Sequence, residues 1–389
     1  MRVCHVVYSY YPFDPRVRKE TEALADAGYD VDVIAVRDEG ELNVELVGPI
    51  LVHRIPMSIS RGGPVRYLFQ YLLFFFLSSA LLLRLYMKRR YRVIHVHSLP
   101  DFQVFCTLPE RIFGAQVVLD LHEAFPEILA ARLGRSMNDG LVLVAKGLEF
   151  FSCKYAVRVV VATQLRKKIL ARRGLPVFKS LVVMNSFDLP PVQLASDELR
   201  VRLGLEGRIV LVQAGGINPE RDLGTLIDAS ARLAASRPLS LLLFGKGSED
   251  YKNELRQIAV NTPELDFRIG EWMLPIEAFA HVALTDVGVV TYVRNPLTEI
   301  AAPHKVFDYV AAGKPLVLAD LPGLREVWEG AALFYQPSDP EDLAQRVTQV
   351  LEMPELAQQL RSRASRILES CRWELSRVAL VSMYQELLA

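Results

Sequence analysis

The feature that most constrains the fold is an alternation of short apolar runs with longer amphipathic segments, which occurs twice along the 389 residues. Runs such as Val3 to Val7 and Val31 to Val36 have the length of strands, and a helical pattern joins them. Strands that alternate with helices in this way form parallel α/β sheets. Because the chain is too long for one ordinary core, we expect two domains.

In the first half, an aspartate and a proline mark the start of the first helix. Asp14 is suited to the N-cap, Pro15 to the first helical position, and Gly28 to the left-handed stop at the end. Further strands are predicted at Val93 to Val96, Val117 to Leu119, Val157 to Ala162 and Leu181 to Met184.

The second half repeats the pattern after a linker predicted at Leu189 to Val192, which a polar stretch follows as far as Gly207. Strands are predicted over 209–213, 239–244, 287–291 and 316–319, and helices over 223–235, 341–351, 355–369 and from 373 onward. The expected domains are residues 1–190, joined by a C-terminal helix over 372–389, and residues 205–371. Two doubly wound domains would face each other across a cleft where the carboxyl ends of their strands meet.

The charge balance and the cysteines exclude several classes of protein. Lys and Arg number 45, as do Asp and Glu, so no global field recruits nucleic acid. The four cysteines lie among apolar neighbours, without the spacing of a metal site or a disulfide framework. Together with an N-terminus that enters a strand directly, this predicts a cytoplasmic protein. Separately, we expect no cofactor.

The segment APHKVFDYVAAGKPLV, residues 302–317, is the most informative motif. Pro303 suits the first turn of a helix, which would direct the N–H groups of His304 and Lys305 outward with the positive end of its dipole. Such an end favours a diphosphate. Asp308, one turn along, suits hydrogen bonds to a ribose diol. From these residues alone, an ordinary capped surface helix is the commoner explanation.

With this motif the sequence resembles the retaining glycosyltransferases of family four, in the branch with the pattern P-x-K-x-x-E-Y-x-A-x-G-x-P-V. Four further segments carry the resemblance over nearly the whole chain: RVRKETEALADAGYDVDV from Arg16, the D-x-H-E-x-x-P-E match from Asp120, the Met184-Asn185 turn, and the phosphate loop within Gly215 to Ile227. The resemblance implies the GT-B fold and transfer of a sugar from a nucleoside diphosphate.

The resemblance also implies roles for matching residues. His122 and Arg221 would be catalytic: His122 would face the transferred sugar, and Arg221 would hold the diphosphate. Asp308 would bind the ribose, and the main chain from Phe267 to Trp272 would line the base. The alternatives are a core histidine at position 122 and a solvated charge at position 221. The implied donor-binding residues are Gly216, Arg221, Glu299, His304, Lys305 and Asp308.

Three departures from the family pattern concern the site. Ile300 stands where the family often has the first glutamate of the motif, and Glu299 is its neighbour. This shift weakens the case for direct contact between Glu299 and the sugar. Gly216 replaces a basic residue of the phosphate loop, which leaves more of the phosphate charge to Arg221. The residues Asp14-Pro15-Arg16 stand in place of a glycine-rich loop after the first strand, which makes Arg16 a candidate for phosphate or acceptor contact.

A pair of aspartates, Asp30-Val31-Asp32, resembles the D-x-D metal motif of the other glycosyltransferase architecture. Because these aspartates alternate with valines inside a strand, we expect solvated charges on a strand face. No other cluster has metal spacing in the sequence, so we predict a metal-independent enzyme. Preorganised donors would stabilise the departing diphosphate.

The stretch from Tyr67 to Leu83 is nearly all apolar but falls just short of the ~20 residues that span a bilayer. A spanning helix would separate the first two strands from their sheet, so we reject it. Two interpretations stay open: a helix packed inside the first domain, or one in the membrane interface with basic residues on anionic head groups. The membrane face would comprise Phe74, Phe75, Lys88, Arg89 and Arg90, aided by Arg166, Lys167, Lys168, Arg172 and Arg173.

We therefore expect an enzyme that moves a hexose from a UDP- or GDP-sugar to a lipid-linked or glycan acceptor. It would act at the inner face of the plasma membrane, on an anionic surface, in the synthesis of cell-surface polysaccharide or glycolipid. Two alternatives are a nucleotide-sugar 2-epimerase on the same fold and a membrane-associated partner that has lost turnover.

Overall fold

The computed structural model describes residues 1–60, 62–184 and 196–389. The chain divides into two compact units: unit 1 comprises Met1–Asn185 and Trp373–Ala389, and unit 2 comprises Ser186–Arg372. The linker predicted at Leu189 to Val192 and the Asn185 turn lie outside the described residues.

Unit 1 is built on an eight-stranded sheet with the order β3-β4-β2-β1-β5-β6-β7-β8. Its strands are β1 (Arg2–Tyr10), β2 (Asp30–Val36), β3 (Val44–Val47), β4 (Ile50–Ile55), β5 (Val93–His97), β6 (Gln116–Leu121), β7 (Arg158–Val161) and β8 (Ser180–Val182). All neighbours are parallel except β3 and β4. The six predicted strands are confirmed, but β3 and β4 were missed. Neither has an apolar run, because β3 is a half-exposed edge strand and β4 carries His53 and Arg54.

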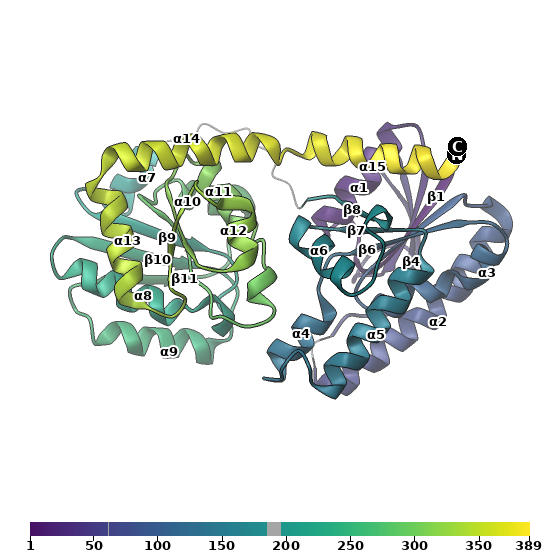
Figure 1. Ribbon diagram of the computed structural model, residues 1–389, viewed down its shortest axis with the longest axis horizontal. Coiled ribbons are helices and arrows are strands. Elements are labelled where there is room, and N and C mark those ends of the chain that lie inside the picture. Colours follow the sequence, from purple (N-terminus) through teal and green to yellow (C-terminus); the bar gives the residue numbers. More distant parts are fainter. Residues whose placement is uncertain (61, 185–195) are drawn as a thin grey trace. The chain divides into compact units, whose positions relative to one another are not determined.

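Helices cover both faces of this sheet (Figure 1). One face carries α1 (Pro15–Asp26) and α15 (Trp373–Leu388), whose Tyr384 and Leu380 are fully buried. The other face carries α2 (Pro64–Arg89), η1 (Asp101–Thr107) and α5 (Gly140–Tyr155). The remaining elements are α3 (Leu108–Ile112), α4 (Phe125–Arg132), α6 (Gln164–Arg172) and η2 (Val177–Lys179).

The first helix begins and ends as its sequence predicts. The Asp14 carboxylate accepts hydrogen bonds from the Arg16 and Val17 amides at 3.1 and 3.2 Å, and Pro15 is the first helical residue. Gly28 follows the helix with φ +88°, a conformation that side chains with a Cβ rarely adopt. The short loop after β1 therefore leads directly into α1.

Unit 2 contains two three-stranded parallel sheets, β11-β10-β9 and β12-β13-β14. The strands are β9 (Ile209–Ala214), β10 (Leu239–Phe244), β11 (Asp266–Gly270), β12 (Gly288–Val290), β13 (Leu316–Ala319) and β14 (Leu333–Tyr335). The Asp286 amide donates to the Val210 carbonyl at 2.8 Å, which joins β12 to β9. The order of strands therefore reverses at β9, and ligands bind α/β sheets at such a switch point. The short or polar strands β11 and β14 were not predicted.

Helices also cover both sides of unit 2 (Figure 1). One side carries α8 (Leu223–Ala234), α9 (Glu249–Val260) and α13 (Pro340–Glu352). The other carries α10 (Pro275–Val282), α11 (Lys305–Ala311), α12 (Pro322–Trp328) and α14 (Pro354–Ser370). Shorter elements are α7 (Ser196–Arg202), η3 (Pro219–Arg221) and η4 (Thr298–Ile300). The predicted helices near 223–235, 341–351, 355–369 and from 373 are confirmed.

Candidate active site

Glycine loops after β9 and β10 lie against each other at the carboxyl edge of unit 2. The Gly215 amide donates to the Phe244 carbonyl at 2.8 Å. Gly245 has φ +154°, and a Cβ there would lie 1.7 Å from the Gly215 oxygen, so this position requires glycine. Gly216 follows in the same loop. The edge is therefore lined by main chain, which lets a phosphate approach peptide N–H groups.

Arg221 is held at this edge by the two residues that follow β12. Its guanidinium donates to the Tyr292 hydroxyl and lies 4.9 Å from the centroid of that ring. The Thr291 hydroxyl donates to the Arg221 carbonyl. Because Tyr292 and Thr291 are both buried, the guanidinium has a defined place at the switch point.

Lys305, the first residue of α11, is 8 % exposed. Its Nζ is buried and has no hydrogen-bond partner within the described part of the chain. Burial lowers the pKa of Lys305 well below 10.5, the Arg221 guanidinium lowers it further, and Asp308 opposes the change. A buried ammonium without an anion raises the free energy of the folded state. Lys305 and Arg221 together form a cationic site suited to a diphosphate.

The other predicted donor residues have different surroundings. Asp308 is partly buried, and burial raises the pKa of its carboxyl while His304 and Lys305 lower it. His304 is exposed and precedes α11, which begins two residues later than predicted because 303–304 form a turn. Glu299 forms a 3.3 Å ion pair with Arg294 at the surface. The structure thus brings Arg221, His304, Lys305 and Asp308 within electrostatic reach of one another, whereas Glu299 has its own partner.

In unit 1, the D-x-H segment lies at the end of β6. The His122 Nε2 lies 2.8 Å from Asp120 Oδ2 and 2.9 Å from His97 Nδ1, and the side chain is 14 % exposed. Asp120 is fully buried, and Arg16 donates to its two oxygens at 2.8 and 3.0 Å. Burial raises the pKa of Asp120, but Arg16 and His122 outweigh this and hold it well below its usual range. An ionised carboxylate therefore orients His122 with Nε2 inward.

Two family models match the chain. Residues 16–189 match Glycosyltransferase Family 4, and residues 208–353 match Glycosyl transferases group 1. The chain belongs to glycosyltransferase family 4. It is a glycosyltransferase of the GT-B type.

Known proteins similar to this glycosyltransferase support the same assignment. TuaH of Bacillus subtilis, named for teichuronic acid biosynthesis, is 29 % identical over 143 residues, which are 35 % of this chain and only 33 % of TuaH. Sucrose-phosphate synthase from Thermosynechococcus elongatus superposes with a TM-score of 0.78 at 18 % identity, over 100 % of this chain and 99 % of that one. HepE from Anabaena, solved with UDP and glucose, gives 0.69 at 17 % identity, over 99 % and 100 %. The solved structures establish the GT-B fold.

The Arg16 side chain of this glycosyltransferase binds groups of the protein, and the phosphate or acceptor contact predicted for it stays a prediction. Besides Asp120, the guanidinium lies 3.3 Å from Glu20 and donates to the Val183 carbonyl at 2.7 Å, and its side chain is 9 % exposed. The sequence could not show this, because Asp120 is 104 residues away. We assign Arg16 the role of keeping Asp120 ionised.

The predicted membrane face also needs correction. Phe74 is fully buried in the core and Phe75 packs against it, while Arg89 pairs with Asp30 and Asp32, each at 2.8 Å. Only Lys88 and Arg90 of that set are exposed. A helix that is apolar on all sides does not reveal which side is buried, so the face was assigned to the wrong aromatic residues.

Two of the other basic residues predicted to contact the membrane also form ion pairs inside the protein. Arg166 and Arg173 both form ion pairs with Glu127 and Glu149, and Glu149 is fully buried. Lys168 and Arg172 are exposed, and Lys167 is partly exposed. The helix segment Val65–Arg89 nevertheless has the length and composition to cross a membrane.

The aspartate pair in β2 is only partly solvated. Asp30 is exposed, as predicted, but Asp32 is fully buried and bonds to the Tyr91 hydroxyl and Arg89, with His53 at 3.5 Å. The prediction of two solvated charges is wrong for Asp32, because the sheet is covered on both faces. Asp32 anchors the end of α2 through Arg89.

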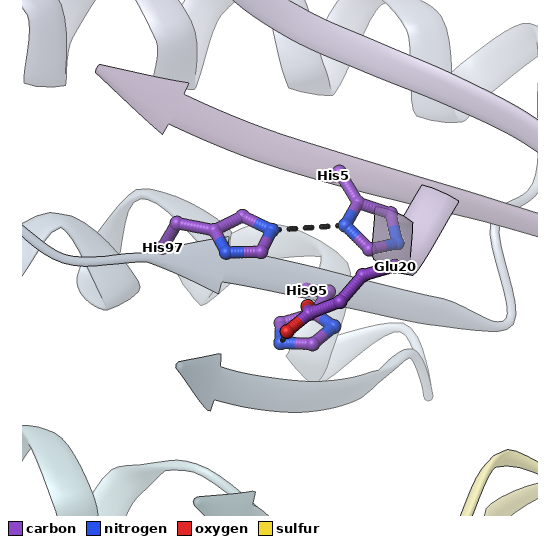
Figure 2. A group of neighbouring side chains, drawn as sticks. All are labelled: His5, Glu20, His95 and His97. Carbon is purple, nitrogen blue, oxygen red and sulfur yellow. Dashed lines mark hydrogen bonds and ion pairs between the residues drawn. The ribbon is translucent and has the colours of Figure 1, made fainter. Parts of the chain in front are cut away.

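The sequence analysis did not predict a cluster of buried polar residues that adjoins His122 through His97. Figure 2 shows His5, Glu20, His95 and His97, whose ligand-type atoms all lie within 4.8 Å of one another. His95 and His97 alternate on β5 and so share one face, and His5 on β1 stands beside His95 in register. The spacing of His95 and His97 was the signal in the sequence that could have revealed this cluster. It was missed because the segment was interpreted only as an apolar strand of the core.

Proposed function

We propose that this glycosyltransferase moves a hexose from a UDP- or GDP-sugar to a lipid-linked or glycan acceptor, with retention and without a metal ion. The observation that carries the proposal is the buried Lys305 Nζ, which has no hydrogen-bond partner among the residues that the structure describes and feels the charge of Arg221. A nucleoside diphosphate would supply the missing anion. HepE has been solved with UDP and with UDP-glucose, which supports a UDP-sugar donor. The TuaH match supports a place in cell-surface polysaccharide synthesis.

In this mechanism the protein stabilises charge and supplies no nucleophile. Departure of the nucleoside diphosphate leaves negative charge on its phosphates and positive charge at the sugar C1. Lys305 and Arg221 are fixed in place before the reaction and stabilise the first charge. His122 binds a sugar hydroxyl, and its carboxylate partner Asp120 supports the second. Because two cations meet the leaving group, we propose that no metal is required.

Binding of UDP or GDP at mildly alkaline pH should take up a proton. The pKa of Lys305 is lowered in the free protein, and a bound diphosphate raises it again, so the fraction present as the neutral amine takes up a proton on binding. Isothermal titration calorimetry in buffers of different ionisation enthalpy measures this uptake. Lys305→Met should abolish it, and Lys314→Met, which removes another lysine whose pKa burial lowers, should not.

A binding enthalpy that is independent of the buffer would contradict the assignment of Lys305. The product of the reaction tests the chemistry separately. Incubation with donor and a lipid-linked acceptor should yield a glycoside, whereas isomerisation of the sugar with donor alone would show an epimerase.

We also propose that unit 1 lies on the inner face of the plasma membrane, in the cytoplasm, through the outward side of α2. Buried residues recur along one side of this helix, including Gln70, Phe74, Ser78 and Leu82. The outward side is itself apolar, with exposed Val65, Leu68, Phe69, Leu72, Phe76 and Met87. Lys88 and Arg90 follow at the end of the helix and suit anionic head groups. Large apolar surface beside basic residues is typical of an interfacial helix.

The double variant Phe69→Ser/Phe76→Ser should lower binding to vesicles containing phosphatidylglycerol by at least about 10-fold, because each exposed aromatic contributes ~1.5–3 kcal/mol when buried. Flotation at low salt measures this. Val260→Ser/Met353→Ser, which changes two exposed apolar residues of unit 2, is the control. Equal flotation of the two double variants would exclude α2 as the membrane face.

A further inference from the structure

A row of buried hydrogen bonds leads from His122 to the last helix of the chain. The His122 Nε2 lies 2.9 Å from His97 Nδ1. The His97 Nε2 in turn lies 2.9 Å from His5 Nδ1, the contact that is dashed in Figure 2. The Tyr384 hydroxyl lies 3.4 Å from His5 Nε2 and 2.9 Å from His95 Nδ1. All four residues beyond His122 are fully buried. The row therefore joins the end of β6 to α15.

The same residues are poorly arranged for a metal ion. The rings of His95 and His97 are stacked, with centroids 4.6 Å apart and planes within 13°, so their nitrogen lone pairs run alongside each other. Metal ligands must direct their lone pairs at one point, ~2.0–2.1 Å away. In the neighbouring group of His97, Asp120 and His122, the Asp120 Oδ2 already accepts from Arg16 at 2.8 Å. Hydrogen bonding accounts for the cluster better.

Donor and acceptor rules assign the protons along the row. The ionised Asp120 only accepts, so the proton between it and His122 belongs to Nε2. This one N–H is shared between Asp120 Oδ2 and a bare His97 Nδ1, which itself lies 3.4 Å from that oxygen. His97 then donates from Nε2 to His5 Nδ1. Burial lowers the pKa of His5, His95 and His97, so each imidazole carries one proton.

The protons at the far end of the row, at His5, Tyr384 and His95, follow from the same rules. His5 donates from Nε2 to the Tyr384 hydroxyl, which donates to His95 Nδ1. The remaining proton of His95 is on Nε2, 3.9 Å from a Glu20 oxygen. That distance is too long for a hydrogen bond, and neither Glu20 oxygen nor His95 Nε2 has a hydrogen-bond partner in the described residues. His97 and His5 thus each donate once and accept once, His95 accepts from Tyr384, and the Nδ1 of His122 is left as an acceptor.

We propose that His97, His5, Tyr384 and His95 form a positioning relay that holds His122 in the Nε2–H tautomer, so that its Nδ1 accepts a hydrogen bond from a sugar hydroxyl. The use of that acceptor rests on the proposed function; the tautomer itself does not. Tyr384 is the decisive member, because without its hydroxyl the His5 Nε2 loses its acceptor. His5 then favours the opposite tautomer, and His97 Nδ1–H competes with His122 for Asp120.

The variant Tyr384→Phe tests the relay in the full-length protein. In protein labelled with ¹⁵N-histidine, His122 is assigned by the signals lost in His122→Asn. Its Nε2 should be protonated and its Nδ1 bare in the unaltered protein, and Tyr384→Phe should shift the population toward Nδ1–H. The kcat should fall about 10-fold, the worth of one hydrogen bond, with the donor KM within about twofold.

Tyr29→Phe is the matched control, because Tyr29 packs edge-on against the Tyr384 ring at 5.8 Å and is not a member of the relay. It should leave the His122 signals and kcat unchanged. If Tyr384→Phe does not fold, His95→Gln breaks the row one step further from His122 and should shift the same tautomer. An unchanged His122 tautomer in a folded variant would overturn the relay, whereas failure of transfer with every donor would instead overturn the proposed function.

Discussion

Lys305→Met will make the ligand-free protein more stable while it weakens binding of UDP or GDP by about 100-fold. In the described part of the chain, the buried Lys305 Nζ has no hydrogen-bond partner, and the charge of Arg221 opposes its own, so an apolar side chain of similar length removes an unfavourable charge. We expect a gain of about 1–3 kcal/mol in the free energy of unfolding. The two effects have opposite signs because the same missing anion causes both.

The pH dependence of stability gives this prediction a further check. The folded pKa of Lys305 is lowered, so the unfolded chain binds more protons between the folded and the unfolded value, and stability rises with pH in that window. Lys305→Met should flatten this rise. Urea denaturation across the alkaline range and calorimetry with UDP measure the two effects. Native affinity for UDP in Lys305→Met would refute the donor site in unit 2.

Asp120→Asn will destabilise unit 1 by about 3–5 kcal/mol, because it leaves the buried Arg16 without its main counter-ion. It will also lower kcat by about 100-fold or more, since an amide can donate to His122 and permit the wrong tautomer. Thermal or urea unfolding and steady-state transfer measure these losses. Donor affinity should change little, because the proposed diphosphate site belongs to unit 2.

The double variant Arg16→Gln/Asp120→Asn separates stability from activity. Because neither buried charge is left alone, part of the lost stability should return, whereas kcat should stay low. The pKa of Asp120 is lowered in the folded state, so its stabilisation is present above the unfolded value of about 3.9 and is lost as pH falls through the folded one. The acid branch of the stability curve should therefore be flatter in Asp120→Asn. Full activity in the double variant would exclude Asp120 from orienting His122.

Much of the architecture was predictable because local contacts encode it. Asp14, Pro15 and Gly28 mark the first helix through interactions within a few residues. The strands β9, β10 and β13 are apolar runs that are buried on both faces, so their bounds follow from composition. The strands β3, β11 and β14 are short or half-exposed, and pairing with a neighbour, more than composition, makes them strands.

For the candidate site, the sequence supplies a list of residues whose roles stay predictions. The motif around Lys305 and the segment around His122 lie within the ranges that match the two family models. The motif does not show that Lys305 lacks a hydrogen-bond partner among the described residues, or that Arg221 is held by Tyr292, 71 residues away. It also does not show which side of α2 is buried.

The amino-acid order alone therefore specifies the alternation of elements and the caps of the first helix, and it indicates the residues proposed to bind a nucleotide sugar. The tertiary structure decides the partners of the buried polar and charged groups. Arg16 binds Asp120, 104 residues away in the sequence, and Tyr384 bonds to His95, 289 residues away. Periodicity and capping act over a few residues, whereas the desolvation of a charge depends on every segment that packs around it. This is why His122 is visible in the sequence, while the row of histidines behind it emerges only when β1, β5 and α15 come together.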